Sequence, residues 1–176
     1  MAQNRKIARR YAKAFVHDKL DKKQIDTLTG ELESFIITLE SDERINEFFK
    51  SPVYSGDVKI KVIGNIGKKI GFSTYIVSLI ETLIKNDRMN IINDIFYELR
   101  SISDEVNNRV RVKVTTAYEP SVKDVNVLSQ RISDFFGRHA IVERHIEKSI
   151  IGGFVLEGDD RIIDMSVKGQ IERALK

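Results

Sequence analysis

Residues 150–168, IIGGFVLEGDDRIIDMSVK, contain two short apolar runs separated by a turn of one glycine and two aspartates. Two apolar runs around such a turn are typical of a β-hairpin. Ser166 follows the second run, at a position where a serine can cap a helix. Gly152 and Gly153 lie near the start of the first run, where glycines permit a bulge or the close approach of another backbone segment. The stretch predicts a hairpin that leads into a terminal helix, and it offers no nucleophile, metal cluster or phosphate cradle.

The segment before this hairpin predicts a strand, a helix and a second strand. In residues 109–115, valines alternate with charged or polar residues, which is the period of a half-buried strand. In residues 125–136, apolar side chains recur at helical spacing, and Gly137 is suited to end that helix. Residues 140–146 predict the second strand. Together with the hairpin, these elements predict a small α/β domain over residues 107–176.

Residues 1–106 carry a helical period almost throughout. Their apolar side chains recur every three or four residues in six successive blocks. Asp42 and Ser73 stand where helix N-caps are expected, and Gly71 stands where a helix is expected to end. Six helices with short connections imply a bundle of antiparallel neighbours. The predicted fold class is therefore α+β, mostly α, with a six-helix bundle over residues 1–106 followed by the small domain over residues 107–176.

The overall composition is that of an ordinary soluble globular protein. The 176 residues are 41% hydrophobic and 31% charged, and no apolar run approaches the ~18 residues that a membrane-spanning helix needs. The first residues are charged from Arg5 onward and contain no apolar segment of the kind found in secretory signals. The chain has no cysteine, which excludes disulfides, thiolate nucleophiles and zinc–thiolate sites.

The N-terminal helix is predicted to be basic. Arg5, Lys6, Arg9, Arg10 and Lys13 fall within a few turns, although the formal net charge of the whole chain is only +3. A basic helix face is either solvated or meets a partner of opposite sign. The sequence alone leaves both interpretations open.

Residues 62–70, VIGNIGKKI, contain a G-x-x-G pattern followed by lysines, which resembles the loop of a KH-type RNA-binding module. That module needs strands beside its loop, whereas residues 73–85 carry a helical period and no alternating run precedes Ser55. The pattern favours a helix with a glycine near its C-terminal end. The alternative function is an RNA-binding adaptor that uses the segment Gly64–Lys69.

The sequence predicts no catalytic residue, no metal site and no cofactor. The three histidines, His17, His139 and His145, form neither a His-x-x-x-His pair nor a His-Glu-x-x-His motif. The turn aspartates Asp159 and Asp160 lack the ligand spacing of a calcium loop. The pair Gly152–Gly153 lacks the three-glycine spacing of a dinucleotide-binding loop, and no serine lies in a G-x-S-x-G elbow. We therefore expect a protein that is not an enzyme.

Six short blocks occur in an order that resembles one family. They are IARRYAKAF (7–15), LIKNDRM (83–89), VTTA (114–117), IIGG (150–153), GD (158–159) and IDMSV (163–167). The set spans nearly the whole chain and resembles the delta subunit of bacterial and chloroplast F-type ATP synthases, whose mitochondrial counterpart is the oligomycin-sensitivity-conferring protein. Three positions depart from the family pattern: Arg10 replaces a frequent proline, Pro120 stands near a common leucine, and Met165 replaces a frequent small residue.

The resemblance implies a non-catalytic role in ATP synthesis and hydrogen ion transport. Such a subunit sits on the catalytic head and joins it to the peripheral stalk, the stator, so that proton-driven rotation is coupled to ATP synthesis. The implied location is peripheral, at the cytoplasmic face of the bacterial inner membrane, with membrane association only through the complex. Nucleic acid is not an implied partner.

The resemblance also implies two protein partners. The N-terminal helix of one ATP synthase alpha subunit would lie in a groove between the first and fifth helices of the bundle. The C-terminal domain would receive the ends of the b subunits. Carried over position by position, the groove residues are Ile7, Arg10, Tyr11, Ala14, Leu79, Ile80 and Leu83.

Overall fold

The computed structural model describes residues 2–16, 20–159 and 161–175, so His17 and Asp160 lie outside the described residues. The chain divides into two compact units, residues 1–103 and 104–176. The sequence placed the division after Val106, whereas the structure places it before Asp104, within the last turn of a helix. Each unit has its own hydrophobic core.

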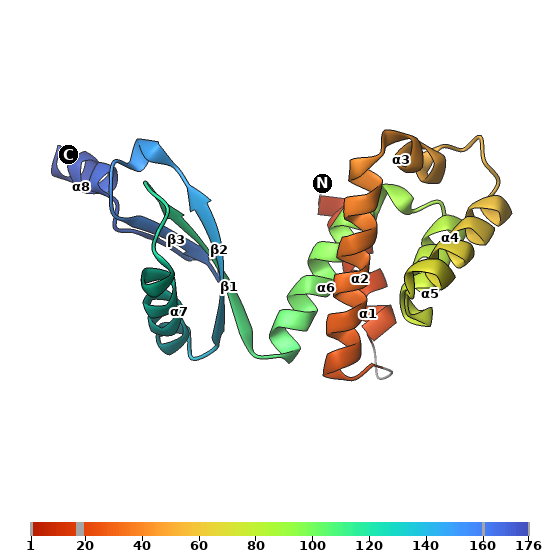
Figure 1. Cartoon of the computed structure of the whole chain (residues 1–176), viewed down its shortest axis with the longest axis horizontal. Helices are drawn as coiled ribbons and strands as arrows, with labels where there is room; N and C mark the ends of the chain where they lie inside the picture. The colour runs from red at the N-terminus through yellow and green to blue at the C-terminus, as the bar shows by residue number, and fades with distance from the viewer. Residues whose placement is uncertain (1, 17–19, 160, 176) are drawn as a thin grey trace. The chain divides into compact units, whose positions relative to one another are not determined.

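In its described residues the first unit contains six α-helices (Figure 1), and together with the sheet of the second unit they confirm the predicted fold class. The elements are α1 (Ala2–Val16), α2 (Lys22–Ser41), α3 (Glu43–Lys50), α4 (Gly56–Ile70), α5 (Thr74–Lys85), the short 3-10 helix η1 (Met89–Ile91) and α6 (Ile92–Val106). The last turn of α6 extends into the second unit. No helix among the described residues is both long and apolar enough to cross a lipid bilayer.

Local sequence fixes the helix ends. Asp42 caps α3 by accepting a hydrogen bond from the Arg44 amide, and Ser73 caps α5 by accepting one from the Ile76 amide. Gly71 ends α4 in the left-handed region, at φ +82°, where a glycine avoids the penalty that a side chain would incur. These helix starts and stops confirm the predictions made from the sequence.

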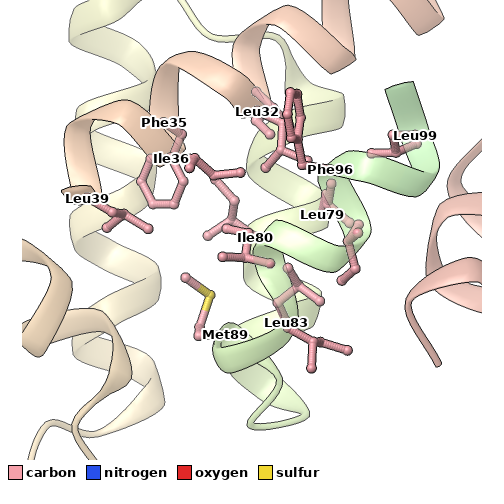
Figure 2. Close-up of a cluster of buried hydrophobic side chains, with 14 of the residues drawn as sticks. Leu32, Phe35, Ile36, Leu39, Leu79, Ile80, Leu83, Met89, Phe96 and Leu99 are labelled. Carbon is pink, nitrogen blue, oxygen red and sulfur yellow. The ribbon is translucent and has the colours of Figure 1, made fainter. Parts of the chain in front are cut away.

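The core of the first unit lies among α2, α5 and α6 (Figure 2). Leu79, Ile80 and Leu83 of α5 are all 0% exposed, and Figure 2 shows them among the packed side chains of this cluster. Helix α1 joins the same core through Ala8 and Ala12, which are also fully buried.

The G-x-x-G segment does not form the loop of a nucleic-acid-binding module, because it lies inside helix α4. A Cβ atom on Gly67 would stand 2.7 Å from Cγ2 of Val77, so the glycine lets α4 and α5 pack closely. Gly64 has open space around it. Gly67 therefore serves helix packing, and the RNA-binding alternative loses the loop that it required.

A carboxylate of α2 holds the start of α5. Glu31 accepts hydrogen bonds from both the amide (2.8 Å) and the hydroxyl (2.5 Å) of Ser73, which in turn caps α5. Removing this partly buried carboxylate leaves the Ser73 amide without its partner.

We expect Glu31→Ala to lower the free energy of unfolding by about 1–3 kcal/mol, measured by denaturant unfolding followed by far-UV circular dichroism. Glu33→Ala is the matched control, because Glu33 is exposed on the same helix. A loss no larger than that of the control would show that the link between α2 and α5 contributes little.

The second unit is a four-stranded sheet with helices around it. The strands are β1 (Arg109–Thr116), β2 (His139–Ile146), β3 (Phe154–Gly158) and β4 (Arg161–Asp164), in the spatial order β2-β1-β3-β4. The other elements are α7 (Val122–Phe136), the 3-10 helix η2 (Lys148–Ile150) and α8 (Val167–Ala174). Strands β1 and β2 are parallel, and the remaining pairs are antiparallel. Helix α7 connects β1 to β2 and lies on one face of the sheet (Figure 1), where the buried valines of β1 pack with Ile132.

The hairpin forms, but its first strand starts later than the sequence indicated. Ile151 has φ +69° and Gly153 has φ +74°, so the chain turns there instead of extending, and β3 begins at Phe154. A Cβ atom on Gly153 would overlap the carbonyl oxygen of Met165, which confirms the predicted close approach of two backbone segments. Ser166 caps α8 as predicted. Hydrogen bonds from Ser166 hold the pKa of Asp164 below its usual range.

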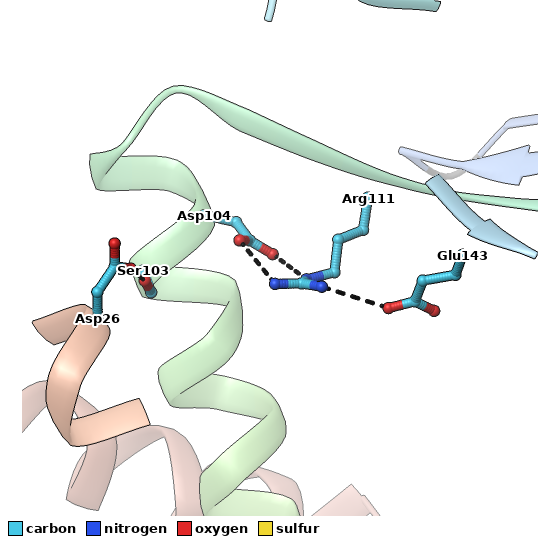
Figure 3. Close-up of polar contacts among 5 residues, drawn as sticks. All are labelled: Asp26, Ser103, Asp104, Arg111 and Glu143. Atoms are coloured by element: carbon cyan, nitrogen blue, oxygen red, sulfur yellow. Dashed lines mark hydrogen bonds and ion pairs between the residues drawn. The ribbon is translucent and has the colours of Figure 1, made fainter. Parts of the chain in front are cut away.

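The end of α6 carries two polar contacts on adjacent residues (Figure 3). Within the first unit, the Ser103 hydroxyl donates a hydrogen bond to a carboxylate oxygen of Asp26. Within the second unit, the Arg111 guanidinium of β1 pairs with Asp104 at 2.6 Å and with Glu143 of β2 at 3.4 Å. The Asp104 pair fastens the last turn of α6 to the sheet that follows it.

Candidate functional site

The first hollow of interest is formed mainly by α1. Ile7, Arg10, Tyr11 and Ala14 line it together with Arg88, which follows α5, and its volume is about 470 Å³. We call this set of residues the α1 pocket. The four α1 residues recur at three- and four-residue spacing, so they share one helix face. The structure thus brings together all four of the predicted groove residues that lie on α1.

The α1 pocket combines an apolar floor with two cations. Ile7 and Tyr11 are half-buried and pack against the core, whereas Ala14 is exposed. Arg10 and Arg88 are exposed, and within the described part of the chain neither forms an ion pair with a carboxylate. An amphipathic helix with apolar and acidic side chains would match both properties of this surface.

The three predicted groove residues on α5 do not lie at this surface. Leu79, Ile80 and Leu83 are fully buried, because α5 is largely apolar and packs against both α2 and α4. The prediction that these side chains face an open groove therefore needs correction. Arg88, just beyond the end of α5, lines the pocket in their place. It lies in the block LIKNDRM, so the sequence carried a signal that could have identified it.

A second hollow of about 910 Å³ lies between α1 and α6. Its lining residues are Asn4, Arg5, Lys6, Arg9, Asp94, Tyr97, Glu98 and Ser101. Arg5 pairs with Glu98 at 3.3 Å, and the Tyr97 ring lies 5.4 Å from the Arg100 guanidinium. Its lining mixes cations with two carboxylates, Asp94 and Glu98, whereas both charged residues of the α1 pocket are arginines. Sequence reasoning missed it because its two walls come from helices far apart in the chain.

A third hollow, of about 450 Å³, lies in the second unit between the end of β1, the first half of α7 and the glycines before β3. Tyr118, Val127, Leu128 and Phe154 give it apolar walls. We call it the β1–α7 pocket. The sequence did not identify it, since its walls come from three separate segments.

The side chains that line these hollows offer apolar surface and charged groups. Among residues 2–16, 20–159 and 161–175, no group of three His, Cys, Asp or Glu side chains could hold a metal ion. Several carboxylates near the hollows are committed to helix caps or ion pairs, as Asp124 and Glu98 are. The apolar floors and unpaired arginines suit the recognition of protein segments.

Comparisons with known proteins agree on one family. The family described as "ATP synthase delta (OSCP) subunit" matches residues 7–176. The ATP synthase subunit delta of Syntrophus aciditrophicus is 30% identical over 172 residues, covering 96% of this chain and 93% of the relative. That of Solidesulfovibrio magneticus is 28% identical over 168 residues, covering 94% and 92%. The chloroplastic ATP synthase delta chain of Chlamydomonas reinhardtii is 24% identical over 174 residues, covering 98% and 80%.

A solved structure shares the fold. A chain of the Toxoplasma gondii mitochondrial ATP synthase hexamer superposes with a TM-score of 0.68 at 19% identity, covering 96% of this chain and 94% of that one. The likeness includes both units, because the coverage is nearly complete. At this identity the likeness concerns the fold alone.

Proposed function

The chain belongs to the ATP synthase delta (OSCP) subunit family, and from this premise we propose that it is a non-catalytic stator subunit that links the catalytic head to the peripheral stalk. Proton-driven rotation exerts torque on the head, so a link of this kind couples rotation to ATP synthesis. The observation that carries the proposal is the family match over residues 7–176, which includes both units. Two binding sites for other subunits, one on each unit, would allow the chain to hold the head still against this torque.

The α1 pocket is the proposed joint to the head. Its occupant is the N-terminal helix of one ATP synthase alpha subunit, whose apolar side chains would lie on Ile7, Tyr11 and Ala14. Arg10 and Arg88 would then face acidic side chains at the edges of that helix. Leu79, Ile80 and Leu83 would support this surface from beneath without touching the partner, since all three are fully buried.

The second unit is the proposed joint to the stalk, and its partners are the ends of the b subunits. Attachment to the membrane would occur only through the assembled complex, at the cytoplasmic face of the bacterial inner membrane. Two joints on one molecule also add avidity, because binding at the first raises the effective concentration at the second.

Reconstituted ATP synthase tests the proposal. When the complex is assembled without this chain, we expect ATP hydrolysis by the head to continue while ATP-driven proton pumping into vesicles is lost, and adding the purified chain should restore pumping. Co-purification with the tagged chain should yield both the alpha and b subunits. Full pumping in its absence, or recovery of neither subunit with the tagged chain, would contradict a stator role.

Arg88→Gln should weaken binding of the alpha-subunit N-terminal peptide by about three- to tenfold and reduce the salt dependence of its association rate, because a cation at the pocket edge is removed. Stopped-flow measurements at several salt concentrations give both quantities. Arg9→Gln is the matched control, since Arg9 is an exposed cation of α1 that lines the hollow shared with α6 instead. Equal effects of the two substitutions would mean that only the net charge of the unit matters.

A further inference from the structure

The β1–α7 pocket exposes large apolar side chains in the second unit. Tyr118 is 73% exposed and Val127 is 54% exposed, while Leu128 and Phe154 form a half-buried floor that continues into the core of this unit. The volume of about 450 Å³ is within the range of natural ligand pockets. An open apolar hollow of this size suits an anchoring side chain of a partner.

The lining of this pocket carries charges of both signs. Glu119 is paired with Arg144 at 3.1 Å, and Asp124 accepts the Ser121 hydroxyl at 2.6 Å within the capping box of α7. Arg131, also in the lining, is exposed and forms no ion pair with a carboxylate within the described ranges. Arg131 is therefore a cation of the lining with which a negatively charged group of the partner could pair.

The backbone beside the pocket is strained. Ile151 immediately precedes Gly152 and Gly153 of the pocket wall, and it holds φ at +69°, which a β-branched side chain rarely adopts. It is also 57% exposed, so burial of its side chain does not enforce this conformation. Backbone strain of this kind clusters at binding sites, where it fixes the shape of a wall before the partner arrives.

We infer that the β1–α7 pocket binds a stalk segment through one large apolar side chain that enters the pocket and a neighbouring carboxylate that pairs with Arg131. The inference rests on the proposed function, because the b subunits supply the segment. The apolar side chain contacts Tyr118, Val127 and Leu128, and the carboxylate lies at the α7 edge of the pocket.

The test is calorimetric titration of the full-length chain with a soluble C-terminal segment of the b subunit from the same organism. Val127→Asp places a charge in the apolar wall and should weaken binding at least about tenfold. Val122→Asp is the matched control, because Val122 is 78% exposed on the same helix and does not line the pocket. Arg131→Gln should weaken binding about three- to tenfold and flatten its dependence on salt.

The outcomes separate the two proposals. If the unmodified chain fails to bind the b segment, the proposed function fails, and this inference with it. If the unmodified chain and Val127→Asp bind equally well, the pocket assignment is overturned while the stator role stands. Circular dichroism checks folding, and Tyr118→Ser replaces Val127→Asp if that variant does not fold, because Tyr118 lies in a connecting segment and is 73% exposed.

Discussion

Tyr11→Asp should abolish measurable docking of the alpha-subunit N-terminal peptide, with a loss of affinity of at least about 30-fold, or about 2 kcal/mol. Tyr11 lies in the centre of the α1 pocket's lining face, between Ile7 and Ala14 in sequence, and its ring forms part of the apolar floor. A carboxylate there must be desolvated beneath the docking helix, which is unfavourable even with arginines nearby. Calorimetry with the peptide measures the loss directly.

One alternative variant and one control variant accompany this experiment. Replacing the half-buried Tyr11 can disturb folding as well as binding. Ala14→Asp avoids this difficulty because Ala14 is exposed in the same pocket. Tyr54→Asp introduces the same charge in the connection between α3 and α4, away from the pocket lining, and should bind as the unmodified chain does. Unchanged affinity in both Tyr11→Asp and Ala14→Asp would remove α1 from the joint to the head.

Leu83→Ala should destabilise the first unit by about 2–5 kcal/mol, the range measured for deletion of buried leucine side chains. Leu83 is 0% exposed in a cluster built from several helices, so its removal leaves a cavity that the surrounding helices cannot fully close. Denaturant unfolding followed by far-UV circular dichroism measures the change. Lys85→Ala, at an exposed position of the same helix, should change the stability by less than about 0.5 kcal/mol.

Leu83→Ala also tests whether the Leu83 side chain only supports the α1 pocket or touches the bound peptide itself. If Leu83 only supports the α1 pocket, the folded fraction of Leu83→Ala should bind the alpha-subunit peptide within about threefold of the unmodified affinity. A large loss of affinity with little loss of stability would instead mean that the side chain reaches the partner, contrary to its burial.

The helical unit was predictable because its signals are local. The spacing of apolar residues and the caps at Asp42 and Ser73 depend on neighbours within one or two turns, and the structure has the helices where these signals place them. Which side of an apolar helix remains open depends on distant partners. This is why Leu83 was expected in a groove although α2 and α4 enclose α5, and why Arg88 was missed.

The second unit shows the same division between local and distant information. Alternating valines identified β1, because period two is a property of the strand itself. The run before Phe154 is equally apolar, yet it turns at Ile151 and Gly153 instead of extending. The backbone of Met165 lies so close to Gly153 that only a glycine fits there, and hydrophobicity alone does not reveal this contact.

The small size of Ala8 and Ala12 affects the shape of the surface on both sides of α1 as well as the packing of that helix. Both hollows beside α1 are bounded by residues of that helix, so the depth at which it sits sets the width of each. A valine or leucine at either alanine would push α1 outward and reshape both hollows together, while every residue that lines them stayed the same. Relatives that differ at these two positions can therefore diverge in partner affinity even where their contact residues are identical.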